Sequence, residues 1–173
     1  EILIGLVGSE MCIRDRVKGV YKENNPMYAY KVYDRFKIYR PLADKYTKWR
    51  NNLTPYDIQG YEQLPKKGDL LIITKSMKDV MCLYEMGYTA ISPASESTFL
   101  TPDVIDALKL RFKRILICFD RDVPGVKNMR KISLKTGLNG FLVHKKFQSK
   151  DISDAIKNNG FEVIKNWLKE TLS

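Results

Sequence analysis

Short apolar runs alternate with stretches of helical periodicity from residue 69 to residue 172. Stretches of the second kind repeat apolar residues three and four positions apart and carry helix signals, such as Thr101 before Pro102 at a start and Gly137 at an end. Strand–helix alternation of this kind predicts an α/β fold, a parallel sheet with helices on both faces. The predicted strands are DLLIITK, YTAIS, RILICF and GFLVHK (69–75, 88–92, 114–119 and 140–145), and the predicted helices cover 76–87, 101–112, 123–137, 151–160 and 161–172.

The segment before this region has a different pattern of apolar and polar residues. In MYAYKVYDRFKIYR (27–40), tyrosines and branched residues alternate with polar ones, which predicts a β-hairpin with one packed face and with Asp34 and Arg35 between its strands. The basic, aromatic stretch PLADKYTKWRNN and the turn-rich stretch IQGYEQLPKKGD follow. The predicted organisation is a small basic β-rich subdomain at 17–66, a sheet domain at 67–158 and a C-terminal helix at 159–173.

The composition of the chain indicates which class of partner the protein binds. The 173-residue chain carries a net charge of +10, which favours an anionic partner, most commonly nucleic acid, over the alternative of a lysine-rich solvated surface. No apolar run approaches the roughly 18 residues of a membrane span. Cys12, Cys82 and Cys118 are not spaced as metal ligands and are predicted to be reduced thiols. Residues 1–16, EILIGLVGSEMCIRDR, resemble translated sequencing-adapter read-through at the ends of metagenomic gene fragments and are excluded from the fold prediction.

Acidic residues follow the predicted strands. In an open parallel sheet, ligands bind outside the carboxyl ends of the strands, so these residues are expected at one edge. Hard oxygen donors without histidine or cysteine partners suit Mg²⁺ or Mn²⁺. Helix capping is the alternative for Asp79, Asp122 and Asp151, and plain solvation is the alternative for the loop residue Glu96. Asp120, unlike Asp122, is not explained by helix capping. The acidic residues concerned are Asp79, Glu96, Asp120, Asp122, Asp151 and Asp154.

Three segments together carry a family resemblance. LLIITKSMKDVMCLYEMGY, ILICFDRDVPGVKNMRK and KDISDAI resemble the toprim domain of bacterial and phage DNA primases, over about residues 68–158. The family pattern is a strand leading to Glu-Gly-x-x-Asp, a later strand ending in Asp-x-Asp-x-x-Gly, and a Lys-Asp motif. Asp79 matches the first motif and Lys150–Asp151 the third, while Asp120, Asp122 and Gly125 match the second. The resemblance implies metal binding by Asp79, Asp120, Asp122 and Asp151.

One position departs from the family pattern. The glutamate of the first motif falls on Lys75 and its glycine on Ser76. A protonated lysine does not ligate Mg²⁺, so three hypotheses follow. In the preferred one, Lys75 binds triphosphate or template and Glu96 supplies the lost carboxylate. The others are a site with one ion, and a domain that has lost catalysis. The predicted catalytic residues are Asp120, Asp122, Lys75 and Glu96.

The upstream stretch FKIYRP…KYTKWRNN…IQGYEQLP resembles the small subdomain that precedes toprim in these primases, where basic residues grip nucleotide phosphates and template. Tyr46 and Trp49 between lysines and arginines also suit base stacking, with an ordinary basic strand as the alternative. The implied nucleotide- or DNA-binding residues are Lys48, Arg50, Asn51, Asn52, Lys75, Lys78, Lys127 and Arg130.

The resemblance implies a DNA primase activity: ribonucleotidyl transfer on a single-stranded DNA template in bacterial or phage replication. Its partners would be the template, ribonucleoside triphosphates and, further, a replicative helicase. Such a protein would be located in the cytoplasm of a bacterium or a phage-infected host, with no membrane as a partner. Two alternatives remain: a catalytically silent toprim module that binds nucleic acid in a replication complex, and a toprim nuclease in which water is the nucleophile.

Overall fold

The computed structural model describes residues 26–95 and 98–172. The adapter-like residues 1–16, Cys12 and Glu96 lie outside the described residues. Contacts divide the chain into two compact units. Among the described residues, the first unit holds 26–29 and Ile38–Arg50, and the second holds Tyr30–Lys37, 51–95 and 98–172. The predicted division at residue 66 stays a prediction.

A five-stranded sheet organises the second unit, in the order β4-β6-β5-β7-β8. Neighbouring strands are parallel from β6 to β8, as the alternation of strands and helices predicts. The edge strand β4, which comes first in the sequence among the five strands of this sheet, is antiparallel to β6 and pairs Ile58 with Pro93. The sheet is therefore mixed and not purely parallel. The strands are β4 (Ile58–Gln59), β5 (Gly68–Ile73), β6 (Ala90–Pro93), β7 (Phe112–Cys118) and β8 (Asn139–Phe141).

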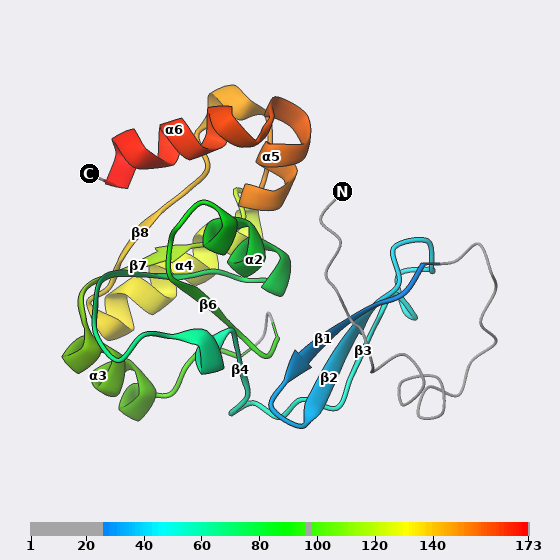
Figure 1. The fold of residues 1–173 in the computed structure, drawn as a ribbon, viewed down its shortest axis with the longest axis horizontal. Helices are drawn as coiled ribbons and strands as arrows, with labels where there is room; N and C mark the ends of the chain where they lie inside the picture. The colour runs from blue at the N-terminus through cyan, green and yellow to red at the C-terminus, as the bar shows by residue number, and fades with distance from the viewer. Residues whose placement is uncertain (1–25, 96–97, 173) are drawn as a thin grey trace. The chain divides into compact units, whose positions relative to one another are not determined.

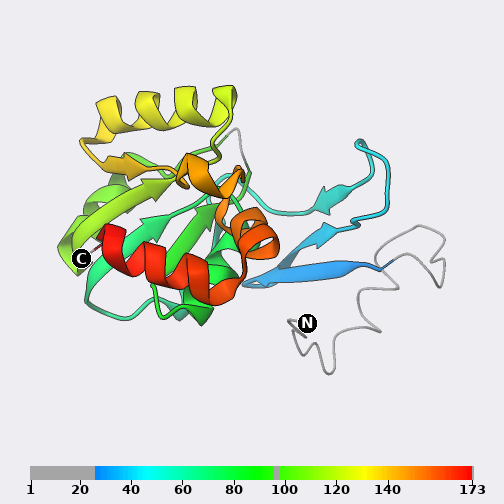
Figure 2. The ribbon, with the colours of Figure 1, turned by 90° about the horizontal axis from the view of Figure 1, so that it is seen from above.

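Helices cover both faces of this sheet, as predicted (Figures 1 and 2). Alternate side chains of β5 point to opposite faces: Leu71 and Ile73 pack with α3 and α4, and Ile72 packs with α2, α5 and α6. Burial on both faces explains the continuous apolar run of this strand. The helices are α2 (Met77–Glu85), α3 (Pro102–Arg111), α4 (Val123–Thr136), α5 (Ile152–Asn159) and α6 (Phe161–Leu172), with short 3₁₀ turns η1 (Tyr61–Gln63) and η2 (Lys145–Phe147).

The predicted hairpin is present as β1 (Tyr28–Val32) and β2 (Arg35–Tyr39), and β3 (Trp49–Asn51) completes a three-stranded sheet in the order β1-β2-β3. Its turn is Tyr33–Asp34, so Arg35 already belongs to β2. The Tyr33 N–H donates to Glu62 Oε2 at 2.9 Å, and the Arg35 guanidinium pairs with the buried Asp57 at 2.8 Å. Both bonds lie within the second unit, where they hold the turn against the segment from Asp57 to Glu62.

The surroundings of the buried Asp57 carboxyl determine its pKa. Burial alone would raise the pKa of its carboxyl, but hydrogen bonds from the Thr54 N–H and hydroxyl, and then the Arg35 guanidinium, lower the pKa overall. Asp57 is therefore a stable anion at neutral pH.

No helix in the described part of the chain combines the length and the apolar character that a bilayer crossing needs.

Candidate metal and nucleic-acid site

Four aspartates, Asp79, Asp120, Asp122 and Asp151, lie near one another at the carboxyl edge of the sheet, where α2, α4 and α5 begin. Asp122 caps α4, where its Oδ1 accepts from the Gly125 N–H at 2.7 Å. Asp151 caps α5 in the same way, accepting from the Asp154 N–H at 2.7 Å. The capping roles considered for Asp122 and Asp151 are confirmed. Asp120 lies two residues after the end of β7 and caps no helix.

A backbone link joins the second and third motifs. The Arg121 N–H donates to the Lys150 carbonyl at 2.6 Å, and the Arg121 Nε donates to the Val143 carbonyl at 2.7 Å. Arg121 thus ties the Asp120–Asp122 loop to the segment that ends at Asp151. Arg121 was not predicted from the sequence as a residue of this site. Its position between two aspartates was visible, but the carbonyl partners are set by tertiary structure alone.

Asp79 is buried and joins two helices. Its Oδ2 accepts from the Ser76 hydroxyl at 2.8 Å, and its Oδ1 accepts from the Ser153 N–H at 2.9 Å. Ser76 caps α2 by accepting from the Asp79 N–H at 3.3 Å, which confirms the capping hypothesis. Burial, and then the negative charge of Asp151, raise the pKa of Asp79 to about 7. A structural role follows for Asp79, and its role as a metal ligand stays a prediction.

Asp79→Asn is expected to remove a loss of stability that the wild type shows as the pH rises from about 4 to about 7. A folded-state pKa raised from 3.8 to about 7 favours folding below the unfolded value and loses that contribution as the pH rises through 7. The wild-type free energy of unfolding should fall by about 2–3 kcal/mol between pH 5 and pH 8, since one pKa unit corresponds to about 1.4 kcal/mol. Urea denaturation at both pH values measures it. The neutral amide keeps the shape, so this variant should show little change with pH.

The matched control is Asp69→Asn. Asp69 is exposed and pairs with Lys113, whose hydrogen bond and charge lower the pKa of Asp69. This variant should keep the wild-type fall in stability between the two pH values. An equal fall in Asp79→Asn would show that the pH dependence has another source.

Two lysines offset the repulsion among these acids. Lys75 Nζ lies 3.8 Å from Asp120 Oδ2, with the two side chains only 10% and 15% exposed. Burial raises the pKa of Asp120, and the charge of Lys75 opposes that shift. Lys150 Nζ lies 4.0 Å from Asp151 Oδ2. Burial lowers the pKa of Lys150, but the surrounding aspartates, Asp151 first, raise it overall. In this structure, ammonium groups are the positive partners of the acidic cluster.

The donors at this edge fit a hydrated Mg²⁺ ion better than a closed cage. Among residues 26–95 and 98–172, no three acidic, histidine or cysteine side chains are grouped so that they could hold a metal ion together. Mg²⁺ keeps several waters and takes one or two carboxylates, with substrate phosphates completing its shell. Asp120 and Asp122 can supply those carboxylates, since Asp122 is exposed and uses one oxygen for capping. The oxygens of Asp79 are already engaged by hydrogen bonds.

Gly125 explains the last position of the Asp-x-Asp-x-x-Gly motif. A methyl group there would overlap the Asp120 carbonyl oxygen and come within 2.8 Å of Asp122 Oδ1. The first turn of α4 therefore lies against the loop that carries both aspartates, and only glycine permits that approach.

Gly125→Ala is expected to lower the free energy of unfolding by about 1–3 kcal/mol, the usual range for overpacking, because a backbone oxygen cannot rotate out of the way. Urea denaturation measures the change. Lys127→Ala, an exposed position on the same helix, should stay within about 0.5 kcal/mol of wild type. Similar stabilities for the two variants would contradict the steric account.

Aromatic rings line up in the first unit. The rings of Tyr39 and Trp49 stack with centroids 4.4 Å apart, and those of Tyr28 and Tyr39 lie 6.3 Å apart. Lys48 Nζ lies 5.7 Å from the Tyr39 centroid, and Arg50 is exposed on β3. Trp49 and Tyr28 keep 38% and 46% of their surface exposed. Trp49 was predicted from the sequence as a stacking residue, whereas Tyr28 and Tyr39 were not, although their alternation with polar residues in the hairpin was a usable signal.

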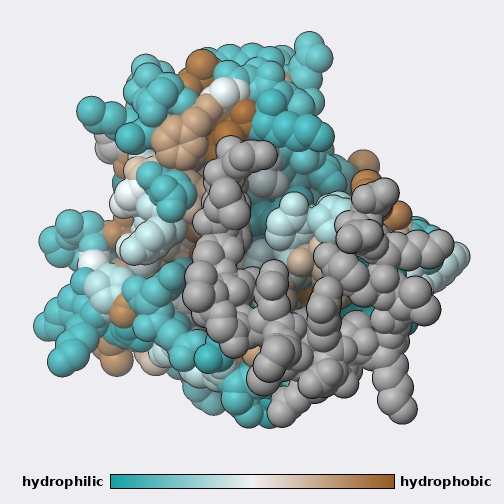
Figure 3. Space-filling model, turned by 45° about the vertical axis from the view of Figure 1, so that its right-hand side comes forward, coloured by the Kyte–Doolittle hydropathy of each residue, from teal (hydrophilic) through white to brown (hydrophobic). Residues whose placement is uncertain are grey.

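The other predicted binding residues have varied surroundings. Asn51 and Asn52 support the backbone locally: their Oδ1 atoms accept from the N–H groups of Leu53 and Phe36. Lys78 is half-buried on α2, whereas Lys127 and Arg130 are exposed on α4. The coloured part of the face seen in Figure 3 is largely hydrophilic, with hydrophobic residues in small patches. These positions stay predictions as contacts of nucleotide or DNA.

Comparisons with known proteins agree on this fold. The Toprim-like family model matches residues 72–156. The catalytic domain of DnaG primase bound to single-stranded DNA is 17% identical, with a TM-score of 0.62 over 84% of this chain and 51% of that chain. The E. coli primase catalytic core is 17% identical (TM-score 0.58, 86% of this chain and 56% of that chain). The primase fragment of the bacteriophage T7 primase-helicase is 15% identical (TM-score 0.57, 89% and 66%).

The chain spans about half the length of the DnaG structures that it matches, 51% and 48%. No curated protein sequence is significantly similar to it. The resemblance inferred from the three motifs is confirmed at the level of the family model and the fold. Residues 72–156 match the Toprim-like family model, and the described part of the chain has the fold of DNA primase catalytic cores.

Proposed function

We propose that this chain is the polymerising part of a primase, which joins ribonucleotides on a single-stranded DNA template. The observation that carries the proposal is the pair Asp120 and Asp122 at the carboxyl edge of the sheet, held in place by Gly125 and by the Arg121–Lys150 backbone link. The fold similarity to a DnaG catalytic domain that binds single-stranded DNA supports the same activity.

The residues divide the work as follows. Asp120 and Asp122 would hold one hydrated Mg²⁺ or Mn²⁺ ion, which supplies positive charge to the phosphates of the incoming nucleotide when bound. Lys75 would keep Asp120 ionised, and Lys150 would attract the anionic substrate toward Asp151. Catalysis of this kind depends mainly on positioning and on charge stabilisation.

Template binding is assigned to the first unit. The stacked rings of Tyr28, Tyr39 and Trp49 offer flat faces to bases, and Lys48 and Arg50 offer charge to phosphates. Aromatic stacking combined with basic side chains is the usual way to bind single strands without sequence preference. A replicative helicase as a further partner and a cytoplasmic location belong to the same proposal.

The second candidate is a module that binds nucleic acid without catalysis. The Lys75–Asp120 distance of 3.8 Å favours it, because an ammonium group beside a ligand carboxylate competes with a metal ion. The two candidates share the fold and differ only in whether nucleotides are incorporated.

Asp122→Asn separates the candidates. Asparagine also caps helices, so α4 should keep its start while one anionic metal donor is lost. Ribonucleotide incorporation on single-stranded DNA with MgCl₂ should fall by about 10–100-fold, the size expected when one charge-stabilising group is removed. Asp103→Asn, an exposed position in the first turn of α3, is the matched control and should keep wild-type rates.

Three results are informative. Incorporation that falls in Asp122→Asn supports the primase. Binding of oligothymidylate by wild type without incorporation supports the silent module, and cleavage without incorporation supports a nuclease at the same aspartates.

A further inference from the structure

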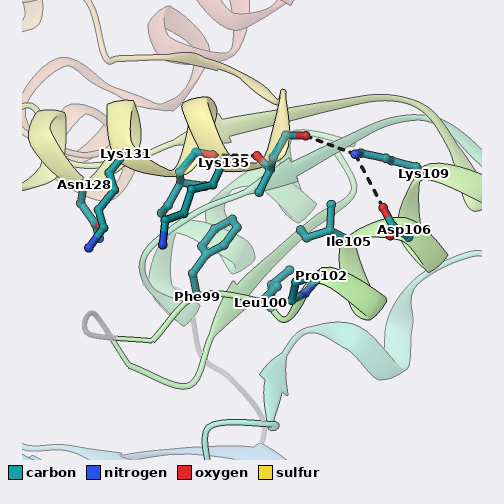
Figure 4. Close-up of a pocket in the computed structure, with 11 residues that line it drawn as sticks. Phe99, Leu100, Pro102, Ile105, Asp106, Lys109, Asn128, Lys131 and Lys135 are labelled. Carbon is teal, nitrogen blue, oxygen red and sulfur yellow. Dashed lines mark hydrogen bonds and ion pairs between the residues drawn. The ribbon is translucent and has the colours of Figure 1, made fainter.

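A cavity of about 480 Å³ lies between α3 and α4, on the face of the sheet that these two helices cover. Its floor is apolar and its rim carries lysines (Figure 4). The floor consists of Phe99, Leu100, Pro102, Ile105 and Ile132.

The three lysines of the rim differ in whether they form hydrogen bonds or ion pairs within the protein. Lys109 donates to the Thr136 carbonyl at 3.2 Å and lies 3.7 Å from Asp106 Oδ1. Lys131 and Lys135 are exposed, one turn apart on α4, and both extend to the side of the cavity where Phe99 lies (Figure 4). Within the described residues, neither takes part in an ion pair or a hydrogen bond.

The chemistry of the lining selects among ligands. An apolar floor can pack against an apolar side chain of a ligand, and the unpaired ammonium groups beside it can form ion pairs with carboxylates. Nucleic acid fits less well, because base stacking needs aromatic faces and Phe99 is the one aromatic residue of this lining.

We propose that this cavity binds an acidic segment of a partner protein, with an apolar anchor residue on the floor and carboxylates on Lys131 and Lys135. The assignment concerns a protein-docking site between α3 and α4 and does not depend on whether the Asp120–Asp122 edge catalyses nucleotide transfer. The net charge of +10 would further speed the encounter with an acidic partner.

A fluorescein-labelled peptide of sequence Asp-Glu-Asp-Phe-Leu-Asp-Glu-Asp tests the proposal by fluorescence anisotropy. Two further peptides separate the contributions: one with serine in place of Phe and Leu, and one with Asn and Gln in place of the acids. Both should bind wild type at least about tenfold more weakly than the first, because anchor and charge act together.

Charge reversal locates the site on the protein. Lys131→Glu/Lys135→Glu should weaken binding of the first peptide by about tenfold or more, since close charge pairs are made repulsive. Lys157→Glu/Lys169→Glu is the matched control: it makes the same charge change at exposed lysines on α5 and α6, and should change the affinity less than about twofold. Circular dichroism melts confirm that both variants fold.

Three outcomes would overturn the proposal. Equal losses in the two double variants would show that net charge alone holds the peptide. Equal binding of the serine-substituted peptide would show that the apolar floor is not used. A loss of oligothymidylate binding in Lys131→Glu/Lys135→Glu, without a loss of peptide binding, would make the groove a path for nucleic acid instead.

Discussion

Ribonucleotide incorporation should fall by about two to three orders of magnitude in Asp120→Asn, the size seen when a central charge-stabilising group is lost. Asp120 is the acid of this edge without a capping role, and its carboxylate lies among Lys75, Asp122 and Asp151. Asparagine keeps the shape and removes the charge that a metal ion requires. The initial rate of labelled ribonucleotide incorporation on single-stranded DNA, at saturating MgCl₂, measures the effect.

Stability must be separated from chemistry in this variant. Removing one partner of a largely buried ion pair costs about 3–5 kcal/mol, because it leaves the other charge uncompensated. Lys75→Met/Asp120→Asn removes both charges and should recover part of that loss of stability without recovering incorporation. A rate within about twofold of wild type in Asp120→Asn would refute a catalytic role for this residue.

Lys75→Glu should make folding depend on Mg²⁺. The substitution replaces an ammonium group 3.8 Å from Asp120 by a carboxylate, so like charges meet in a place where the wild-type side chains are largely buried. In EDTA, the free energy of unfolding should fall by about 3–5 kcal/mol or more, the cost of leaving a buried charge without its partner. Thermal melts by circular dichroism, with and without MgCl₂, measure the fall and its reversal.

The reversal by Mg²⁺ distinguishes a metal site from simple repulsion. A divalent ion that binds the folded state raises its stability by mass action, so the melting temperature of Lys75→Glu should rise with MgCl₂ far more than that of wild type. Lys75→Met is the control, since it removes the same ammonium group without adding a donor. If MgCl₂ shifts the two variants equally, the introduced carboxylate does not ligate the ion.

Local signals explain why the sequence predicted the helices well. Ser76, Asp122 and Asp151 each carry the side-chain oxygen that a helix start requires, and each caps the helix expected after it. The gathering of acids at one edge was also predictable, because parallel strands end on the same side of a sheet.

Features that depend on distant partners were not predictable. Strand β4 is two residues long and lies in a turn-rich loop, and its place is set by the Gln59 side chain, which donates to Ser92 Oγ and the Pro93 carbonyl. The position of Lys75 beside Asp120 was not predicted, and its contact with substrate phosphates stays a prediction. The pairing of Lys75 needed the spacing of two neighbouring strands, which a periodic pattern does not contain.

The Arg121–Lys150 link has a consequence for how the sequence can drift. The bond that holds the two acidic motifs together runs from a backbone N–H to a backbone carbonyl. Every amino acid except proline supplies that donor. A substitution at position 121 or 150, other than proline at 121, therefore leaves this bond in place, although it removes the Arg121 Nε bond to Val143 or the Lys150 charge beside Asp151. The spacing of the two acidic motifs is thus inherited through the path of the main chain.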